Sequence, residues 1–192
     1  MSLAPPSVLM RRFVLAGALV LGASGCTPQP ERTFDPPPTV LYLLRHAETG
    51  EGRDPGLSDE GQARAEALAD LLADRRIAAI YTSQFARTQA TAQPLADTLG
   101  LDVAVRPLDT ADPRGSAARA ICEIAAAYFP QQVVVVGHSN TIPAMIEALT
   151  DTPMADLAHD AYGDLFVVTI TAHPDQRTPD DVTVEQQRFG TP

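Results

Sequence analysis

Two amino acids are missing from this chain, since none of its 192 residues is lysine or tryptophan, and only 5% are aromatic. The 14 basic residues are therefore all arginines, and they face 24 acidic residues, which gives a formal net charge of −10. A chain this negative repels the phosphates of nucleic acid, which argues against a nucleic-acid partner. With 45% hydrophobic residues the chain can still bury a core, built mainly from aliphatic side chains.

Cysteine is equally scarce, and the sequence holds only two, Cys26 and Cys122. No cysteine or histidine spacing typical of a metal site is present, so we expect neither a metal nor a cofactor. Cys122 falls within a helical pattern, where we expect it to pack as a small apolar residue.

No apolar run in the sequence is long enough to cross a bilayer, and the longest one, residues 13–21, lies near the amino terminus. Arg11 and Arg12 precede this run, and small residues follow it up to Cys26. This order is typical of a secretory signal. A cysteine directly after the small residues resembles the bacterial lipoprotein signal, in which Cys26 becomes the lipidated first residue. An ordinary cleaved signal with an incidental cysteine is the alternative.

The chain therefore divides into three predicted parts. Residues 1–25 are the signal peptide, and residues 26–38 are a proline-rich tether that cannot bury much surface. Residues 39–192 form the folded domain. The signal predicts an exported protein of the cell envelope, anchored to the membrane through a lipid on Cys26.

Strand and helix patterns alternate along the domain. We expect strands at residues 40–44, 77–82, 102–106, 133–136, 165–170 and 182–185, and helices at residues 58–74, 84–99, 114–128 and from Ser139 or Asn140 onward. The valine- and leucine-rich strands read as covered on both faces. The sequence therefore predicts an α/β fold with a mostly parallel sheet between helical layers.

Three chemically active segments follow predicted strands. Arg45 and His46 come directly after the first strand, and His138 comes after four valines and Gly137. Arg87 lies in the helix that opens after Thr82. Open α/β sheets place their ligands at the carboxyl ends of their strands, so these side chains are predicted to share one site.

These segments, residues 45–49, 83–88 and 137–141, resemble the histidine phosphatase superfamily, the phosphoglycerate mutase-like proteins. The resemblance implies a three-layer α/β/α sandwich and a phosphatase acting on a small phosphorylated substrate without metal. It implies that His46 is the nucleophile and that His138 stabilises charge. It also implies that Arg45 and Arg87 bind phosphate. Thr49 and Asn140 either contact phosphate or only shape the turns.

The acid that protonates the leaving group is harder to place. The resemblance puts it after the third strand, where Thr110 stands in this chain. Asp109 is the first candidate for the general acid, and Asp112 is the second. This segment is short, which favours a small open phosphatase over a mutase.

Two other functions fit parts of the sequence. The valine run before Gly137 and Ser139 begins like a hydrolase elbow, which would make Ser139 a nucleophile, but a threonine replaces the final glycine of that motif. The uncertain acid also leaves room for a lipoprotein that binds a phosphorylated ligand without hydrolysing it. His159 and His173 lie in polar contexts and are predicted to be on the surface.

Overall fold

A computed structural model describes residues 36–173, 178 and 181–190 of the chain. The predicted signal, Cys26 and most of the tether lie outside the described residues. Within the described part, no helix combines the length and the apolar character needed to cross a membrane.

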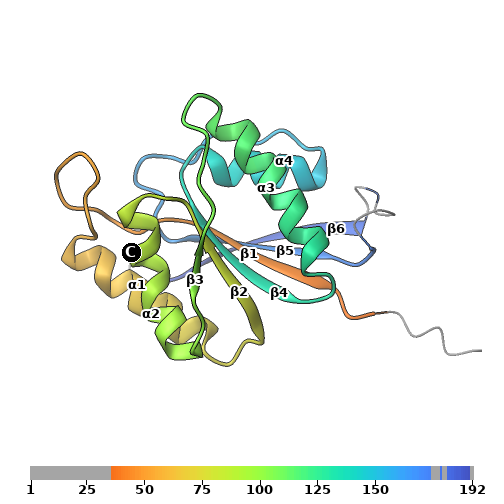
Figure 1. The fold of residues 1–192 in the computed structure, drawn as a ribbon, viewed down its shortest axis with the longest axis horizontal. Coiled ribbons are helices and arrows are strands. Elements are labelled where there is room, and N and C mark those ends of the chain that lie inside the picture. The colour runs from red at the N-terminus through yellow and green to blue at the C-terminus, as the bar shows by residue number, and fades with distance from the viewer. Residues whose placement is uncertain (1–35, 174–177, 179–180, 191–192) are drawn as a thin grey trace, which may run out of the picture. The chain divides into compact units, whose positions relative to one another are not determined.

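The domain is built on one six-stranded sheet with the strand order β3-β2-β4-β1-β5-β6 (Figure 1). The strands are β1 Thr39–Arg45, β2 Ile77–Thr82, β3 Val103–Val105, β4 Gln132–Gly137, β5 Asp164–Ile170 and β6 Val182–Arg188. The first four strands across the sheet are parallel to one another, β5 pairs antiparallel with β1, and β6 pairs antiparallel with β5. The predicted mostly parallel sheet is therefore confirmed.

Helices cover both faces of this sheet. They are α1 Asp59–Leu72, α2 Ala86–Leu99, α3 Pro113–Ala127 and α4 Thr141–Thr150. Figure 1 shows α1 and α2 on one side of the sheet and α3 and α4 on the other. This arrangement confirms the predicted three-layer α/β/α sandwich.

Strand β1 shows how the sequence builds two cores at once. Leu41 and Leu43 pack with the residues of α3 and α4, while Tyr42 and Leu44 pack with those of α1 and α2. Successive side chains of a strand point to opposite faces, so a strand covered on both sides must be apolar throughout. Burying each such leucine contributes roughly 1.5–3 kcal/mol, which fixes β1 and the residues that follow it.

Local signals set the ends of the helices. The Ser58 hydroxyl accepts a hydrogen bond from Gly61 N at 3.2 Å and so caps α1, as predicted. Gly100 ends α2 with a φ of 66°, a left-handed conformation that glycine adopts easily. At α4 the capping position falls on Asn140, but its side chain makes no capping bond. Thr141 Oγ1 instead accepts from His138 N at 2.8 Å.

The expectation for Cys122 is wrong, because its side chain is exposed. The buried positions of α3 are Ala117, Ala120, Ile121, Ile124 and Ala125, which form one stripe along the helix. Cys122 follows Ile121 by one residue and falls outside that stripe, with Sγ 3.9 Å from the carbonyl oxygen of Ala148.

Candidate active site

The carboxyl ends of β1, β2 and β4 bring the predicted site residues together. Arg45 pairs with Gly137 across β1 and β4, and His46 N donates to Gly137 O at 3.0 Å. The rings of His46 and His138 consequently lie with their centroids 5.4 Å apart, edge to face. Residues 92 positions apart in the sequence thus form one cluster.

His46 is oriented for nucleophilic attack. Its Nδ1 lies 2.8 Å from the carbonyl oxygen of Ala47, which can only accept, so Nδ1 carries the proton. The other ring nitrogen, Nε2, therefore keeps a free lone pair. Burial lowers the pKa of His46 to about 4, and the nearby Arg45 and Arg87 guanidinium groups add to this effect. The imidazole is neutral at physiological pH.

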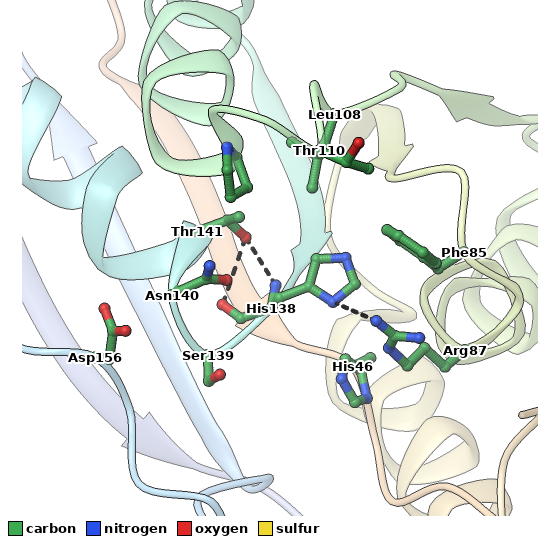
Figure 2. Close-up of a pocket in the computed structure, with 11 residues that line it drawn as sticks. His46, Phe85, Arg87, Leu108, Thr110, His138, Ser139, Asn140, Thr141 and Asp156 are labelled. Atoms are coloured by element: carbon green, nitrogen blue, oxygen red, sulfur yellow. Dashed lines mark hydrogen bonds between the residues drawn. The ribbon is translucent and has the colours of Figure 1, made fainter. Parts of the chain in front are cut away.

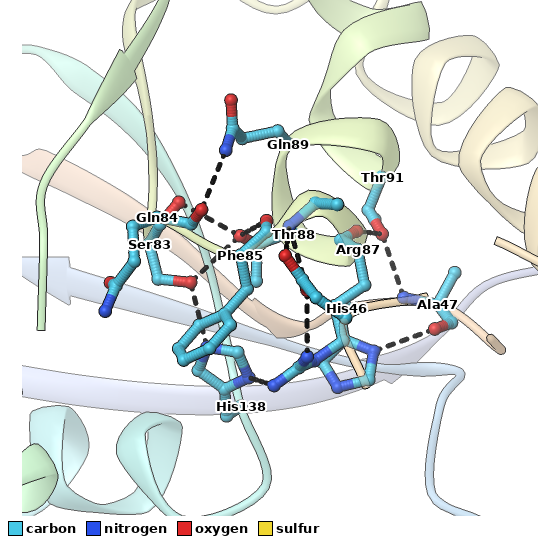
Figure 3. Close-up of polar contacts among 12 residues, drawn as sticks. His46, Ala47, Ser83, Gln84, Phe85, Arg87, Thr88, Gln89, Thr91 and His138 are labelled. Carbon is cyan, nitrogen blue, oxygen red and sulfur yellow. Dashed lines mark hydrogen bonds and ion pairs between the residues drawn. The ribbon is translucent and has the colours of Figure 1, made fainter. Parts of the chain in front are cut away.

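His138 is held through both of its ring nitrogens (Figure 3). Nε2 lies 2.8 Å from the Ser83 hydroxyl, which in turn lies 2.9 Å from Thr88 Oγ1. Arg87 Nη2 lies 3.4 Å from Nδ1, and since a guanidinium can only donate, Nδ1 accepts and Nε2 donates to Ser83. Burial, followed by the Arg87 charge, lowers the pKa of His138 to about 3, so this ring is also neutral.

Arg87 lies in the first turn of α2 and reaches across the histidines. Its guanidinium carbon lies 4.5 Å from the centre of the Phe85 ring. Its Nη1 lies 3.4 Å from Asp54 Oδ1, and both carboxylate oxygens of Asp54 accept from Ala86 N at 3.2 Å. Sequence reasoning missed Asp54 because the stretch of residues 51–57 has no readable pattern.

Arg45 is buried, with only 6% of its surface exposed. Its Nη1 donates to the carbonyl oxygens of Ala158 and His159 at 3.0 and 2.7 Å, and its guanidinium lies 4.0 Å from the centre of the Tyr162 ring. Its Nε has no hydrogen-bond partner among the described residues. A buried N–H without a partner is costly, and an anion bound beside the histidines is the kind of acceptor that would satisfy it. His159, which is exposed as predicted, thus contributes its backbone rather than its ring.

A pocket of about 490 Å³ opens beside the two histidines (Figure 2). Its lining residues are His46, Phe85, Arg87, Leu108, Thr110, Pro113, His138, Ser139, Asn140, Thr141 and Asp156. The volume is that of a small-molecule site and far exceeds one phosphoryl group. The pocket therefore has room for the phosphoryl group and for the remainder of a substrate.

The other predicted site residues differ in whether they line the pocket. Asn140 lines the pocket, whereas Thr49 does not and instead forms an isolated bridge with Leu57. Asp109 is exposed outside the lining, and its Oδ1 accepts from Ala111 N at 2.9 Å in its own turn. Asp112 caps α3 by accepting from Gly115 N at 2.9 Å. Neither carboxylate reaches the pocket, while Thr110 does.

One charged residue of the lining was not predicted at all. Asp156 supplies the pocket with a carboxylate, and it comes from the segment between α4 and β5. That segment shows neither a helical nor a strand pattern, so nothing in the sequence indicated where it would lie. Among the described residues, no group of three or more histidine, cysteine, aspartate or glutamate side chains is placed to hold a metal ion.

A known protein family and a curated protein each match part of this chain. Residues 41–108 match the family model of the histidine phosphatase superfamily, branch 1. An uncharacterised protein of Mycobacterium tuberculosis is 41% identical over 80 residues, which cover 38% of this chain and 40% of that protein. The chain thus matches about two fifths of the length of this curated relative.

Solved structures share the fold over most of the chain. A mycobacterial glucosyl-3-phosphoglycerate phosphatase superposes with a TM-score of 0.58 and 18% identity, covering 78% of this chain and 97% of that chain. A SixA protein from Nakamurella multipartitia, described provisionally as a phosphohistidine phosphatase, gives 0.57 and 25%, covering 82% and 99%. The protein histidine phosphatase SixA in complex with tungstate gives 0.60 and 18%, covering 78% and 96%.

The chain shares the fold of these phosphatases, with two paired histidines at the carboxyl ends of its parallel strands. Over residues 41–108, the family match bears out the resemblance to the histidine phosphatase superfamily.

Proposed function

We propose that this chain is a phosphomonoesterase that hydrolyses a small phosphorylated substrate through a phosphohistidine intermediate on His46. The observation that carries the proposal is the orientation of one ring. The bond from Nδ1 to Ala47 O leaves the Nε2 lone pair of a neutral imidazole beside Arg87 and His138. A neutral imidazole with a free lone pair is a competent nucleophile for phosphorus.

The reaction then runs in two displacements. His46 Nε2 attacks phosphorus, the bond from phosphorus to the leaving oxygen breaks, and that oxygen takes up a proton. Water next attacks the phosphorus bonded to Nε2, the P–N bond breaks, the attacking water releases a proton to solvent, and inorganic phosphate leaves the regenerated imidazole. The Arg87 guanidinium, beside both rings, stabilises the negative charge of the transferring group, and the unpaired Nε of Arg45 supplies a further donor.

Neither aspartate predicted as the general acid lines the pocket, and the one carboxylate among the lining residues, that of Asp156, pairs with Arg114. Thr110 stands where the family resemblance puts the acid, and Asp109 and Asp112 are engaged in their own turn and cap. Structural neighbours carry names that refer to glucosyl-3-phosphoglycerate and to phosphohistidine. Sugar phosphates, other phosphorylated metabolites and phosphohistidine proteins are accordingly the substrate classes to test.

Hydrolysis of para-nitrophenyl phosphate by the chain from Thr39 onward tests the proposal, because this leaving group scarcely needs an acid. We expect turnover that persists in chelator and is lost in His46→Ala. The control is Ser139→Ala, which should lower the rate only slightly. Loss of activity in Ser139→Ala with retention in His46→Ala would indicate a serine hydrolase. Phosphate binding without turnover between pH 4 and 8 would indicate a binding protein.

The position of the protein in the cell is a separate proposal, which rests on the sequence of residues 11–26. We propose that the chain is exported and anchored in the cell envelope by a lipid on Cys26. In the native bacterium, the full chain should fractionate with membranes and incorporate labelled fatty acid, and Cys26→Ser should do neither. A full chain that stays in the soluble fraction without label would contradict this proposal.

A further inference from the structure

The pocket has two chemically different ends. His46, Arg87 and His138 form the end where the phosphoryl group reacts. The remaining space is bounded by Phe85 and Leu108 on one side and by Asn140 and Asp156 on the other. Figure 2 shows Asp156 and Asn140 across the pocket from Phe85 and Leu108. This second end is where the leaving group of a substrate must lie.

Asp156 is fixed in place by its neighbours. Leu157 N donates to Ser139 O at 2.9 Å, which ties the segment to the start of α4. Arg114 Nη1 contacts the Asp156 carboxylate and also donates to Asn140 O at 3.1 Å. These bonds hold a carboxylate at the pocket wall, and its side chain keeps 58% of its surface exposed. The Asp156 carboxylate is therefore held at the pocket wall and is accessible to a ligand.

The charges at this wall do not cancel. Arg114 Nη2 also contacts Glu147 Oε2 at 2.8 Å, so one guanidinium is shared between the carboxylates of Glu147 and Asp156. Glu147 is otherwise engaged, because its Oε1 accepts from Met154 N at 2.7 Å. One guanidinium against two carboxylates leaves a negative charge, and Asp156 is the carboxylate that lines the pocket.

We infer that Asp156 determines substrate specificity at a leaving-group subsite, favouring a leaving group that carries an ammonium or hydroxyl donor and disfavouring one that carries a second anion. The inference rests on the proposed phosphatase function and names the substrate class for that same site. An ammonium or hydroxyl group can donate to the carboxylate, whereas an anionic group at this wall would face net negative charge. The apolar wall opposite would contact the carbon chain of the leaving group.

Three phosphate esters with the same four-carbon chain test this inference. They are 4-aminobutyl, 4-hydroxybutyl and 3-carboxypropyl phosphate, which each have four carbon atoms and carry a cationic, a neutral and an anionic distal group. For the wild-type domain we expect kcat/KM to fall in that order. Exposed ion pairs are worth up to about 1 kcal/mol, a factor of about five, so the ammonium ester should exceed the carboxylate ester by about fivefold.

Asp156→Asn removes the charge while keeping the shape, and it should reduce this ratio to about twofold or less. The matched control is Asp151→Asn, which makes the same change in an exposed residue of the same segment outside the pocket. Its left-handed backbone, with a φ of 56°, also suits asparagine. The control should keep the wild-type ratio.

The outcomes separate the inference from the function beneath it. Turnover of para-nitrophenyl phosphate with equal kcat/KM for the three esters would overturn the inference and leave the phosphatase standing. The inference is also overturned if Asp156→Asn keeps the wild-type ratio of kcat/KM between the ammonium and carboxylate esters. It is likewise overturned if Asp151→Asn changes that ratio as much as Asp156→Asn does. Absence of any hydrolysis, including that of para-nitrophenyl phosphate, would overturn the proposed function and the inference together.

Discussion

The two histidines use their ring nitrogens in opposite ways. His46 donates from Nδ1 to a backbone carbonyl and leaves Nε2 free, whereas His138 donates from Nε2 to Ser83 and accepts from Arg87 at Nδ1. Both rings are neutral, but only His46 has an uncommitted lone pair. The hydrogen bonds of each ring therefore explain why His46 is the better nucleophile.

Ser83 is the residue on which the orientation of His138 depends. Ser83→Ala would leave the buried Nε2–H of His138 without an acceptor, which costs about 1–3 kcal/mol. We expect the variant to unfold at lower urea concentration and to lose about tenfold in kcat, because the ring no longer holds its place against Arg87. Steady-state kinetics with para-nitrophenyl phosphate, together with urea unfolding, measures both effects.

The Ser139→Ala variant serves as the comparison for Ser83→Ala, since Ser139 lines the same pocket but, in the described part of the chain, makes no hydrogen bond with either histidine. Equal kinetics in the two variants would contradict the role assigned to Ser83.

The low pKa values of the histidines predict how stability depends on pH. Both lie below the ordinary value of 6.5, at about 4 for His46 and about 3 for His138. At pH values between the ordinary pKa and the lowered pKa, the unfolded chain binds protons that the folded chain does not. The free energy of unfolding therefore falls as pH drops from about 6.5 toward 4. Each such group contributes up to about 1.4 kcal/mol per pH unit.

Urea unfolding at pH 7 and pH 4.5 checks this sign. His138→Gln removes one of the two groups, so its stability should depend less on pH over this range than that of the wild type. An equal or steeper loss in the variant would show that His138 is protonated in the folded protein.

At the scale of elements, α1 holds the turn that carries the nucleophile. Arg64 of α1 forms a two-pronged ion pair with Glu48, at 2.9 Å from Nε and 2.6 Å from Nη2, and its Nη1 donates to Phe189 O at 2.9 Å. Gly61 lies directly against the Glu48 backbone. The helix thus touches the chain two residues beyond His46.

Gly61→Ala tests how closely that contact is fitted. An added Cβ would lie 2.1 Å from Glu48 O, so either α1 or the turn must shift. Overpacking against backbone costs about 1–3 kcal/mol, and the shift should also lower kcat. Gly56→Ala is the control, because nothing lies within 4 Å of its added Cβ. Urea unfolding that found the two variants equally stable would contradict the fitted contact.

The elements themselves were largely predictable from sequence. The apolar run before Arg45 and the four valines before Gly137 identified strands covered on both faces, and Ser58 and Gly100 marked helix ends. Cys122 was misplaced because an alanine-rich helix presents small residues on every side, which blurs the boundary of its buried stripe. Buried residues that recur every three or four positions do not determine which residue marks the edge of the stripe.

At the scale of the whole molecule, the strand order explains why the site forms. β4 inserts between β1 and β2, so the carboxyl ends of three strands lie side by side and bring Arg45, His46, Arg87 and His138 together. Sequence reasoning found these four because Arg45, His46 and His138 stand at the ends of apolar strands and because the segments that hold the four residues resemble one superfamily. It missed Asp54 and Asp156 because both lie in segments without periodicity, whose positions depend on tertiary contacts alone.

The central claim is that phosphorus becomes bonded to His46, and trapping the phosphorylated enzyme tests it most directly. Rapid alkaline quenching during turnover preserves phosphohistidine, and peptide mass spectrometry then locates it. The account predicts an acid-labile phosphoryl group on His46 that appears within one turnover and is absent from His46→Ala. Continued turnover with no phosphorylated His46, or with the phosphoryl group on another residue, would contradict it.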